Sequence, residues 1–397
     1  MKRFLSFLLV IVLIIPVVTI LNGCDKANVT VKNVSELQEA LTGNKYDDAK
    51  IILGNDLLID SGVSLTISDK KTLDLDEYVL TVNGSLTNNG KVITTSKILG
   101  SGTFTNNGTV QANVNSVNNL TDAFEYANEI SLSGDIINLN GDEYISDISL
   151  NCTNKNYEFS LDLNGHKLGA ELNIINYING SYTNYGATIN IKNSGEKSNA
   201  VMGLDNKDCW YGLMVKGNDK INVTANNVTF LGDQGGIYSN GLCDGAKVIA
   251  TNCTFNGLNS TSGVGAYLAG NYNYNFTNCE FNGATGYYSK SGTHVLKDCM
   301  VKGTNASYSP ANYNGNGAEP TGSALVVDSN PGYIKTLNVT IDGGTYESTS
   351  GYAIEEVSTY KTQSEKVSYA NVTYTENTTL RGAIENILTV NNSVTKV

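Results

Sequence analysis

Three tyrosines recur at matching positions in a repeated part of the chain, and together they could form a ligand-binding surface. Tyr238, Tyr267 and Tyr288 each end a short phrase that begins with glycine, in the pattern Gly-X-Tyr. If this column faces solvent, it forms a flat aromatic strip on which sugar rings can stack. If it faces inward, the rings form a core stack. The strands that carry the phrases are too short for the sequence to decide between these two orientations.

Two further groups are candidates for binding. Trp210, the only tryptophan, stands next to Tyr211 and near Asp205 and Asp208, where an exposed ring could hold a sugar, or Ca²⁺ together with a sugar. A buried tryptophan that closes a junction between two parts of the chain is the favoured interpretation. The second group lies on a loop, and loops on rigid scaffolds often carry binding residues, although a variable solvated loop is the favoured interpretation. Its members are Tyr308, Asn312, Tyr313, Asn314, Asn316 and Glu319.

Acidic residues near the C-terminus offer weak candidates for catalysis. Asp328, Glu355 and Glu356 could place carboxylates on neighbouring coils, and glycoside hydrolysis requires a pair about 5–10 Å apart. Solvated acidic positions near a strand end are the simpler explanation. His166 and His294 lie far apart without a nucleophile and are expected to be structural or surface residues. No Cys-X-X-Cys or histidine-rich spacing predicts a metal, and no cofactor is predicted.

The elements that must position these residues show a repeat. Four similar phrases begin at Asn227, Asn252, Asn278 and Asp298, at intervals of 25, 26 and 20 residues. Apolar and polar residues alternate within each phrase, which indicates strands, and a period of about 20–50 residues is typical of stacked repeats. The Gly-X-Tyr phrases, with Ser323–Val326 and Tyr352–Glu355, supply a second strand in each coil. The sequence therefore predicts an all-β solenoid, a right-handed parallel β-helix.

The organisation along the chain follows from these repeats. Residues 33–114 and 115–198 are predicted to be two related modules, each made of a short capping helix followed by strands. Ser35 is the expected N-cap of the first helix, and residues 117–124 form the second. Such a helix would cover an exposed strand edge. Residues 199–397 form the main β-helix, with a loop excursion at 308–321 that carries Pro310 and Pro320.

The N-terminus indicates export. Lys2 and Arg3 precede an apolar run, residues 4–20, which ends in Leu21-Asn22-Gly23-Cys24. This ending resembles the lipobox of bacterial lipoproteins, which implies a signal peptide at 1–23, a lipidated Cys24 and a tether at 24–32. The protein is then expected outside the cytoplasm, anchored to the bacterial cell membrane. An ordinary cleaved signal with a chance cysteine is the alternative.

Composition excludes some partners and leaves the cysteines open. The net charge of −12 disfavours nucleic acid and other polyanions. Arg381 is the only arginine after the signal, so the chain lacks the arginines that clamp uronate carboxylates. Cys253, Cys279 and Cys299 share one phase of the repeat and predict a buried ladder of thiols, because stacked side chains point the same way. A Cys209–Cys243 disulfide is the other possibility.

The repeated phrases resemble those of the pectin-lyase-like superfamily of right-handed parallel β-helices, from about Val31 to the C-terminus. The segment Leu161–Leu168 is similar to one in bacterial surface proteins of that superfamily. The resemblance implies fold more than activity, and the catalytic motifs of its pectin-degrading enzymes are not present. We therefore predict a cell-surface lipoprotein that binds carbohydrate, as an adhesin does, or another molecule on a host or neighbouring surface. The alternatives are a hydrolase or lyase that acts on neutral glycans, and a structural surface spacer.

Overall fold

The computed structural model describes residues 28–137, 147–205, 209–239, 241–310, 319–328, 337–357, 370–385 and 394–397. The signal peptide and Cys24 lie outside the described residues, and so do five of the candidate site residues, Asp208, Asn312, Tyr313, Asn314 and Asn316. No helix in the described ranges is long and apolar enough to cross a bilayer.

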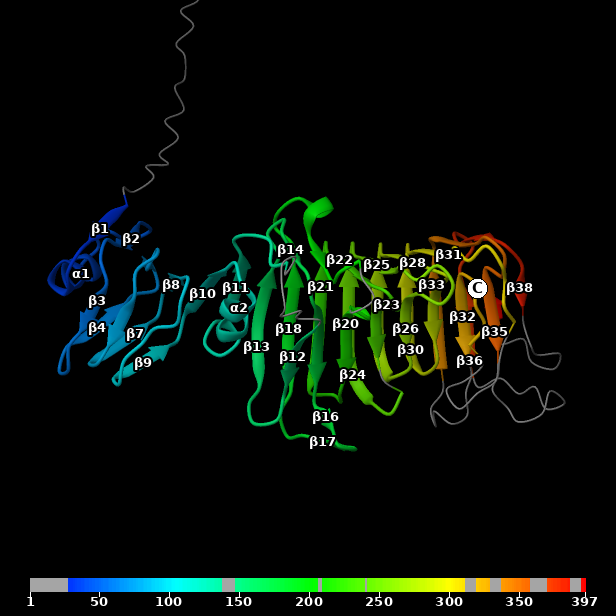
Figure 1. Cartoon of the computed structure of the whole chain (residues 1–397), viewed down its shortest axis with the longest axis horizontal. Coiled ribbons are helices and arrows are strands. Elements are labelled where there is room, and N and C mark those ends of the chain that lie inside the picture. The colour runs from blue at the N-terminus through cyan, green and yellow to red at the C-terminus, as the bar shows by residue number, and fades with distance from the viewer. Residues whose placement is uncertain are drawn as a thin grey trace, which may run out of the picture.

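Most described strands belong to three parallel sheets that run along one axis (Figure 1). The long sheet has 15 strands in the order β1 (Val29–Val31), β2 (Lys50–Leu53), β5 (Thr72–Asp74), β8 (Lys91–Thr94), β10 (Thr109–Val114), β11 (Glu129–Leu132), β13 (Tyr157–Asp162), β18 (Ala187–Lys192), β21 (Ile221–Asn226), β24 (Asp244–Thr251), β27 (Asn271–Thr277), β30 (Gly292–Lys297), β33 (Leu337–Asp342), β36 (Ala370–Tyr374) and β39 (Val394–Lys396).

The other two sheets begin later in the chain. The nine-stranded sheet contains β12 (Asp147–Asn151), β15 (Glu171–Ile175), β20 (Tyr211–Lys216), β23 (Gly235–Ser239), β26 (Val264–Leu268), β29 (Thr285–Ser289), β32 (Leu325–Asp328), β35 (Ile354–Val357) and β38 (Ile384–Glu385). The eight-stranded sheet contains β14 (Lys167–Leu168), β19 (Val201–Met202), β22 (Thr229–Gly232), β25 (Thr254–Gly257), β28 (Glu280–Gly283), β31 (Met300–Gly303), β34 (Thr345–Ser348) and β37 (Thr379–Arg381).

Short elements complete the N-terminal half. Two small parallel sheets pair β3 (Leu57–Ile59) with β6 (Leu80–Val82), and β4 (Ser64–Ile67) with β7 (Ser85–Asn88) and β9 (Thr103–Asn106). An antiparallel hairpin joins β16 (Tyr177–Ile178) to β17 (Ser181–Tyr182), and a 3₁₀ turn covers Lys197–Asn199. The helices are α1 (Val34–Leu41) and α2 (Val117–Ala123).

The predicted parallel β-helix is confirmed. Each full coil visits the eight-stranded, nine-stranded and long sheets in turn, as β22, β23 and β24 do before β25 begins the next coil. Right-handed winding is the sense that crossovers between parallel strands strongly favour. The repeated phrases form β22, β25, β28 and β31, and the Gly-X-Tyr phrases form β23, β26 and β29, as the spacing predicts.

The first residue of each repeated phrase turns the chain from the long sheet into the eight-stranded sheet. These residues adopt left-handed backbone conformations, with φ of 61° at Asn227, 55° at Asn252, 52° at Asn278 and 52° at Asp298. Asn and Asp tolerate this region better than other residues with a side chain. The side-chain amide of Asn278 also donates to Asn252 Oδ1 at 2.6 Å, which links neighbouring coils. The asparagines of the repeat are therefore turn residues.

Inside the coils, apolar side chains stack from one coil to the next. The rings of Phe230, Phe255 and Phe281 lie parallel, with centroids 5.1 and 5.0 Å apart. The core also contains the predicted ladder of thiols, all of them buried. Its members are Cys253, Cys279 and Cys299. No disulfide joins the six described cysteines, so the Cys209–Cys243 alternative is wrong.

Both predicted helices are present, but the N-cap of α1 is Asn33 instead of Ser35. The Asn33 side chain accepts the backbone N–H of Glu36 at 3.0 Å, and the Glu36 carboxylate accepts the N–H of Lys32 at 2.7 Å. This reciprocal pairing satisfies two amides at once, while Ser35 lies inside the first turn. Helix α1 packs on β1, β3 and β4 at the N-terminal end of the solenoid, where it covers the exposed edge (Figure 1).

Candidate functional site

The tyrosine column faces outward, on the nine-stranded sheet. Tyr238, Tyr267 and Tyr288 pair with one another in register, while their neighbours Ile237 and Ala266 point into the core. Tyr238 and Tyr267 are half-buried and Tyr288 is buried. Alternation along the strand places the tyrosines on the outer surface. The orientation that the sequence left open is thus resolved in favour of the outward one.

The tyrosine rings stack on one another, and Tyr211 extends the column by one ring toward the N-terminus. Ring centroids are 4.7 Å apart between Tyr211 and Tyr238, 5.6 Å between Tyr238 and Tyr267, and 5.5 Å between Tyr267 and Tyr288, with interplanar angles of 27°, 11° and 27°. The faces therefore cover each other, and the hydroxyls of Tyr267 and Tyr288 donate to Glu319 and Asp328, at 3.2 and 3.4 Å. The expected flat strip for sugar stacking is not formed, and the four residues make a tyrosine ladder instead.

A buried lysine ends the tyrosine ladder on its C-terminal side. The Lys290 ammonium lies over the rings of Tyr267 (4.7 Å) and Tyr288 (5.0 Å), 3.4 Å from Glu319 Oε1 and 3.9 Å from Asp328 Oδ2. Burial lowers the pKa of Lys290 below its usual value, and the two carboxylates oppose that change. Cation–π contacts and ion pairing together hold the charge on the sheet.

The loop excursion packs back onto the same surface. It leaves the coil after β31 and returns before β32, and an antiparallel bridge between Ser309 and Thr321 closes its base. From this loop, Tyr308 donates its hydroxyl to Glu355 Oε1 at 2.6 Å, and Glu319 accepts the Tyr267 hydroxyl at 3.2 Å. These two loop residues therefore contact the scaffold.

The predicted catalytic carboxylates are covered. Asp328 and Glu356 are fully buried, and Glu355 is 1% exposed. Glu355 accepts hydrogen bonds from Tyr308 and Ser323, and burial raises its pKa above the usual value. Asp328 and Glu355 do lie on the neighbouring strands β32 and β35. Their oxygens, however, hold the loop and the tyrosine ladder, so this arrangement favours packing over acid–base chemistry.

Trp210 is exposed, and the interpretation as a buried junction residue is wrong. Its side chain is 60% accessible to solvent. Its backbone carbonyl accepts the amides of Gln234 and Gly235 on the next coil, at 2.9 and 3.0 Å. The indole remains at the surface, one residue before the first ring of the tyrosine ladder. Asp205 is also exposed.

Sequence reasoning did not identify Glu171, which lies beside this end of the tyrosine ladder. The backbone amide of Tyr211 donates to Glu171 Oε2 at 3.1 Å. Burial raises the pKa of Glu171 to about 7, which the Tyr211 amide opposes and the carboxylate of Asp147, its partner on β12, reinforces. A carboxyl group whose pKa is near neutral therefore lies against the backbone of Trp210 and Tyr211.

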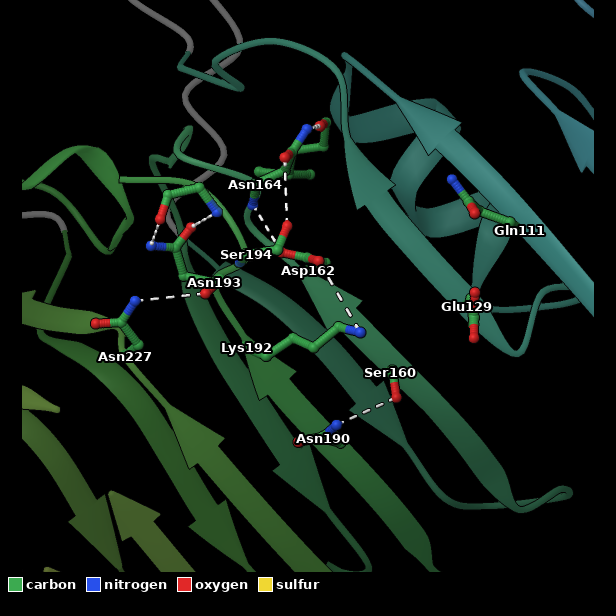
Figure 2. Close-up of polar contacts among 12 residues, drawn as sticks. Gln111, Glu129, Ser160, Asp162, Asn164, Asn190, Lys192, Asn193, Ser194 and Asn227 are labelled. Carbon is green, nitrogen blue, oxygen red and sulfur yellow. Dashed lines mark hydrogen bonds and ion pairs between the residues drawn. The ribbon is translucent and has the colours of Figure 1, made fainter. Parts of the chain in front are cut away.

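Sequence reasoning also missed a polar groove on the outer face of the long sheet. It has a volume of about 600 Å³ and lies where the narrow N-terminal coils meet the wider ones, between the β9–β10 turn and strand β21. Figure 2 shows Glu129, Ser160 and Asn190 from its lining, on three successive strands. The outward polar positions of alternating strands were the available signal, but the groove itself depends on how two kinds of coil join.

The two histidines have separate surroundings. His294 is fully buried and stacks on Tyr274, with centroids 4.5 Å apart. Its Nδ1 accepts the Tyr287 hydroxyl at 2.7 Å, and its Nε2–H donates to the Ser291 carbonyl at 2.8 Å. His166 is at the surface, 3.3 Å from Asp135. Within the described ranges, no three His, Cys, Asp or Glu side chains are grouped to hold a metal ion.

The fold and these surfaces define a protein of the parallel β-helix class. Searches of protein-family models, curated proteins and solved structures found no match to this chain.

Proposed function

We propose that this protein is a lipid-anchored surface protein whose β-helix binds carbohydrate at the N-terminal end of the tyrosine ladder. The observation that carries the proposal is the exposed Trp210, which directly precedes Tyr211, the first ring of the tyrosine ladder. An indole offers an apolar face on which a sugar ring can stack, and Tyr211 and Tyr238 carry phenol hydroxyls at this end of the ladder. Stacking together with hydroxyl contacts is the chemistry that holds a sugar ring.

The outer location is proposed from the N-terminal sequence. Lys2, Arg3, the apolar run and Cys24 are those of a lipoprotein signal. One lipid chain gives only marginal membrane binding, and a diacylglyceryl group supplies two chains, which is enough for stable anchoring. Metabolic labelling with a radioactive fatty acid tests this step, because Cys24→Ser should abolish the label. Retention of label in that variant would exclude Cys24 as the anchor.

Membership of the pectin-lyase-like superfamily remains part of the proposal. The three-sheet coil with asparagine turns is consistent with it. Fold alone does not supply an activity, so the binding function is argued from Trp210.

The test uses the soluble chain, residues 25–397, which retains every described residue. Trp210→Ala and, as a matched control, Tyr182→Ala are compared with the parent on a glycan array and by calorimetry. Tyr182 is an aromatic residue that is 40% exposed on the β16–β17 hairpin, away from the tyrosine ladder. Loss of one stacking contact should weaken binding by about tenfold, or ~1.4 kcal/mol, in Trp210→Ala alone. Equal binding by parent and Trp210→Ala would refute the proposed site.

An enzyme that acts on neutral glycans remains the alternative, and a structural spacer remains the second. The described structure gives no specific support for either alternative. Burial of Asp328, Glu355 and Glu356 disfavours the enzyme. Release of reducing ends from a bound glycan, lost in Glu355→Gln, would favour the enzyme. Absence of any ligand would favour the spacer.

A further inference from the structure

The polar groove on the long sheet differs in chemistry from the tyrosine ladder and lies on another sheet. Two rows of outward side chains cross its floor in register. The first row is Glu129, Ser160, Asn190 and Thr224, and the second is Glu158, Thr188 and Asn222. Successive strands are ~4.8 Å apart, and the rows are ~7 Å apart because two residues separate them along each strand. The floor is thus a regular grid of polar groups.

The two rows differ in whether their side chains already form hydrogen bonds with the protein. In the first row, Asn190 Nδ2 donates to Ser160 Oγ at 3.3 Å, and Thr224 Oγ1 donates to Asn190 Oδ1 at 2.9 Å. In the second row, the side chains of Glu158, Thr188 and Asn222 form no hydrogen bond with the described part of the chain, and Glu158 and Thr188 are exposed. The second row therefore presents donors and acceptors whose orientation is fixed by the sheet and which remain available to a ligand.

The lining also restricts the class of ligand. It contains amides, hydroxyls and two carboxylates, and the nearest cations lie at its margin, Lys91 beside Glu129 and Lys247 next to Asn222 on β24, so the groove itself is built for neutral polar groups. Phe159 and Ile189 lie beneath the floor and are 5% and 1% exposed, which leaves little apolar surface for a hydrophobic peptide. Strands β13, β18 and β21 are each paired on both sides, so no peptide can add as a further strand.

We infer that this groove is a second ligand site, separate from Trp210, which binds a neutral, hydroxyl-rich chain, namely a segment of a neutral glycan that runs along the solenoid axis. Asn222, Thr188 and Glu158 contact successive hydroxyl groups on one edge of the glycan. The wall formed by Asn106–Thr109, in the turn between β9 and β10, limits its extent toward the N-terminus.

Affinity electrophoresis of the soluble chain, residues 25–397, tests this inference with five soluble polymers. Three are neutral (a β-glucan, a mannan and a xylan), polygalacturonate is acidic and chitosan is basic. The key variant is Thr188→Trp, which fills the groove. Its matched control is Thr293→Trp, an exposed threonine in the same outward column on β30, outside the groove. Circular dichroism confirms that each variant retains its strand content.

At least one neutral polymer should bind to the parent protein. Its affinity for Thr188→Trp should be at least tenfold lower, and its affinity for Thr293→Trp should stay within about twofold of the parent value. Asn222→Ala adds no bulk and should weaken the same binding by roughly three- to tenfold, as the loss of one neutral hydrogen bond would. It also serves as the decisive variant if Thr188→Trp fails to fold. Trp210→Ala should leave this binding unchanged, which separates the groove from the Trp210 site.

Three results would overturn the inference. They are binding of no neutral polymer, neutral binding that survives both groove variants, and binding of chitosan alone that is lost in Glu158→Gln. Neutral binding that is lost in Trp210→Ala and kept in Thr188→Trp would support the Trp210 site and exclude the groove.

Discussion

The stability of the solenoid should depend on pH through two buried groups of opposite sign. His294 should stabilise the fold less as the pH falls, whereas Glu171 should stabilise it less as the pH rises. Burial lowers the pKa of His294 from 6.5 to about 4, and only the neutral ring fits its two partners. Nδ1 must accept from Tyr287 while Nε2–H donates to Ser291. Protonation would place a charge in the core and two donors face to face.

The magnitude follows from linkage between protonation and folding. Between pH 6.5 and about 4 the unfolded chain binds a proton at this histidine and the folded chain does not. The contribution of His294 is therefore complete above pH 6.5 and is lost as the pH falls toward 4. At ~1.4 kcal/mol per pKa unit, the full loss is ~3 kcal/mol.

Glu171 has the opposite sign over nearly the same range. Burial raises its pKa from 4.5 to about 7, so the folded chain binds the additional proton. Its contribution is complete below pH 4.5 and is lost as the pH rises toward 7, by up to ~3 kcal/mol. The two effects partly cancel in the parent protein, and the separate variants are needed to resolve them.

Two measurements check this reasoning. Urea unfolding at several pH values between 4.5 and 7.5 should show a steeper loss of stability on acidification in Glu171→Gln than in the parent, and a shallower loss in His294→Gln. Independently, NMR of His166→Gln leaves one histidine, because the chain has two. Its ring resonance should not titrate above about pH 5. A midpoint near 6.5 would refute the buried neutral histidine, whatever the variants do to stability.

Two further predictions concern residues that hold the solenoid and its loop. Lys290→Met should destabilise the fold by about 3 kcal/mol because Asp328 remains buried without its nearest cation, and adding Asp328→Asn should restore part of that loss in a urea double-mutant cycle. Strict additivity of the two changes would exclude the pairing. Asn252→Ala should cost about 1–2 kcal/mol at its φ of 55°, while Asn252→Gly should cost less. Equal losses, measured by urea unfolding, would show that the left-handed turn is not the cause.

The fold was predictable because its repeat marks positions where few residues are suitable. A left-handed turn selects Asn, Asp or Gly, so Asn227, Asn252 and Asn278 stand out in every coil. The strands of the long sheet carry no such signature. Their inward positions need only fill space, so the residue type varies. At one such position, successive coils carry Val248, Tyr274 and His294. The third strand of each coil was therefore not identified from the sequence.

The candidate site was less predictable because contacts between distant residues decide which side chains are accessible. Alternation places Glu355 on the outer surface of its strand, but Tyr308, 47 residues earlier in the chain, covers it. The opposite holds for Trp210. Its backbone carbonyl bonds to the next coil, and its ring is left in solvent, although a lone tryptophan is more often buried than exposed. Neither outcome is encoded by the residues immediately around these positions.

The tyrosine ladder illustrates a constraint that applies to any parallel β-solenoid. Strands in register are ~4.8 Å apart, close to the separation at which aromatic rings stack, so identical aromatic residues at one position cover each other's faces. Tyr238, Tyr267 and Tyr288 obey this rule, with spacings of 5.6 and 5.5 Å. Such a column adds stability and presents hydroxyls, but it has no interior face for a sugar. A ring outside the column must provide one, and this is why Trp210, instead of the repeated tyrosines, is the residue on which the carbohydrate proposal depends.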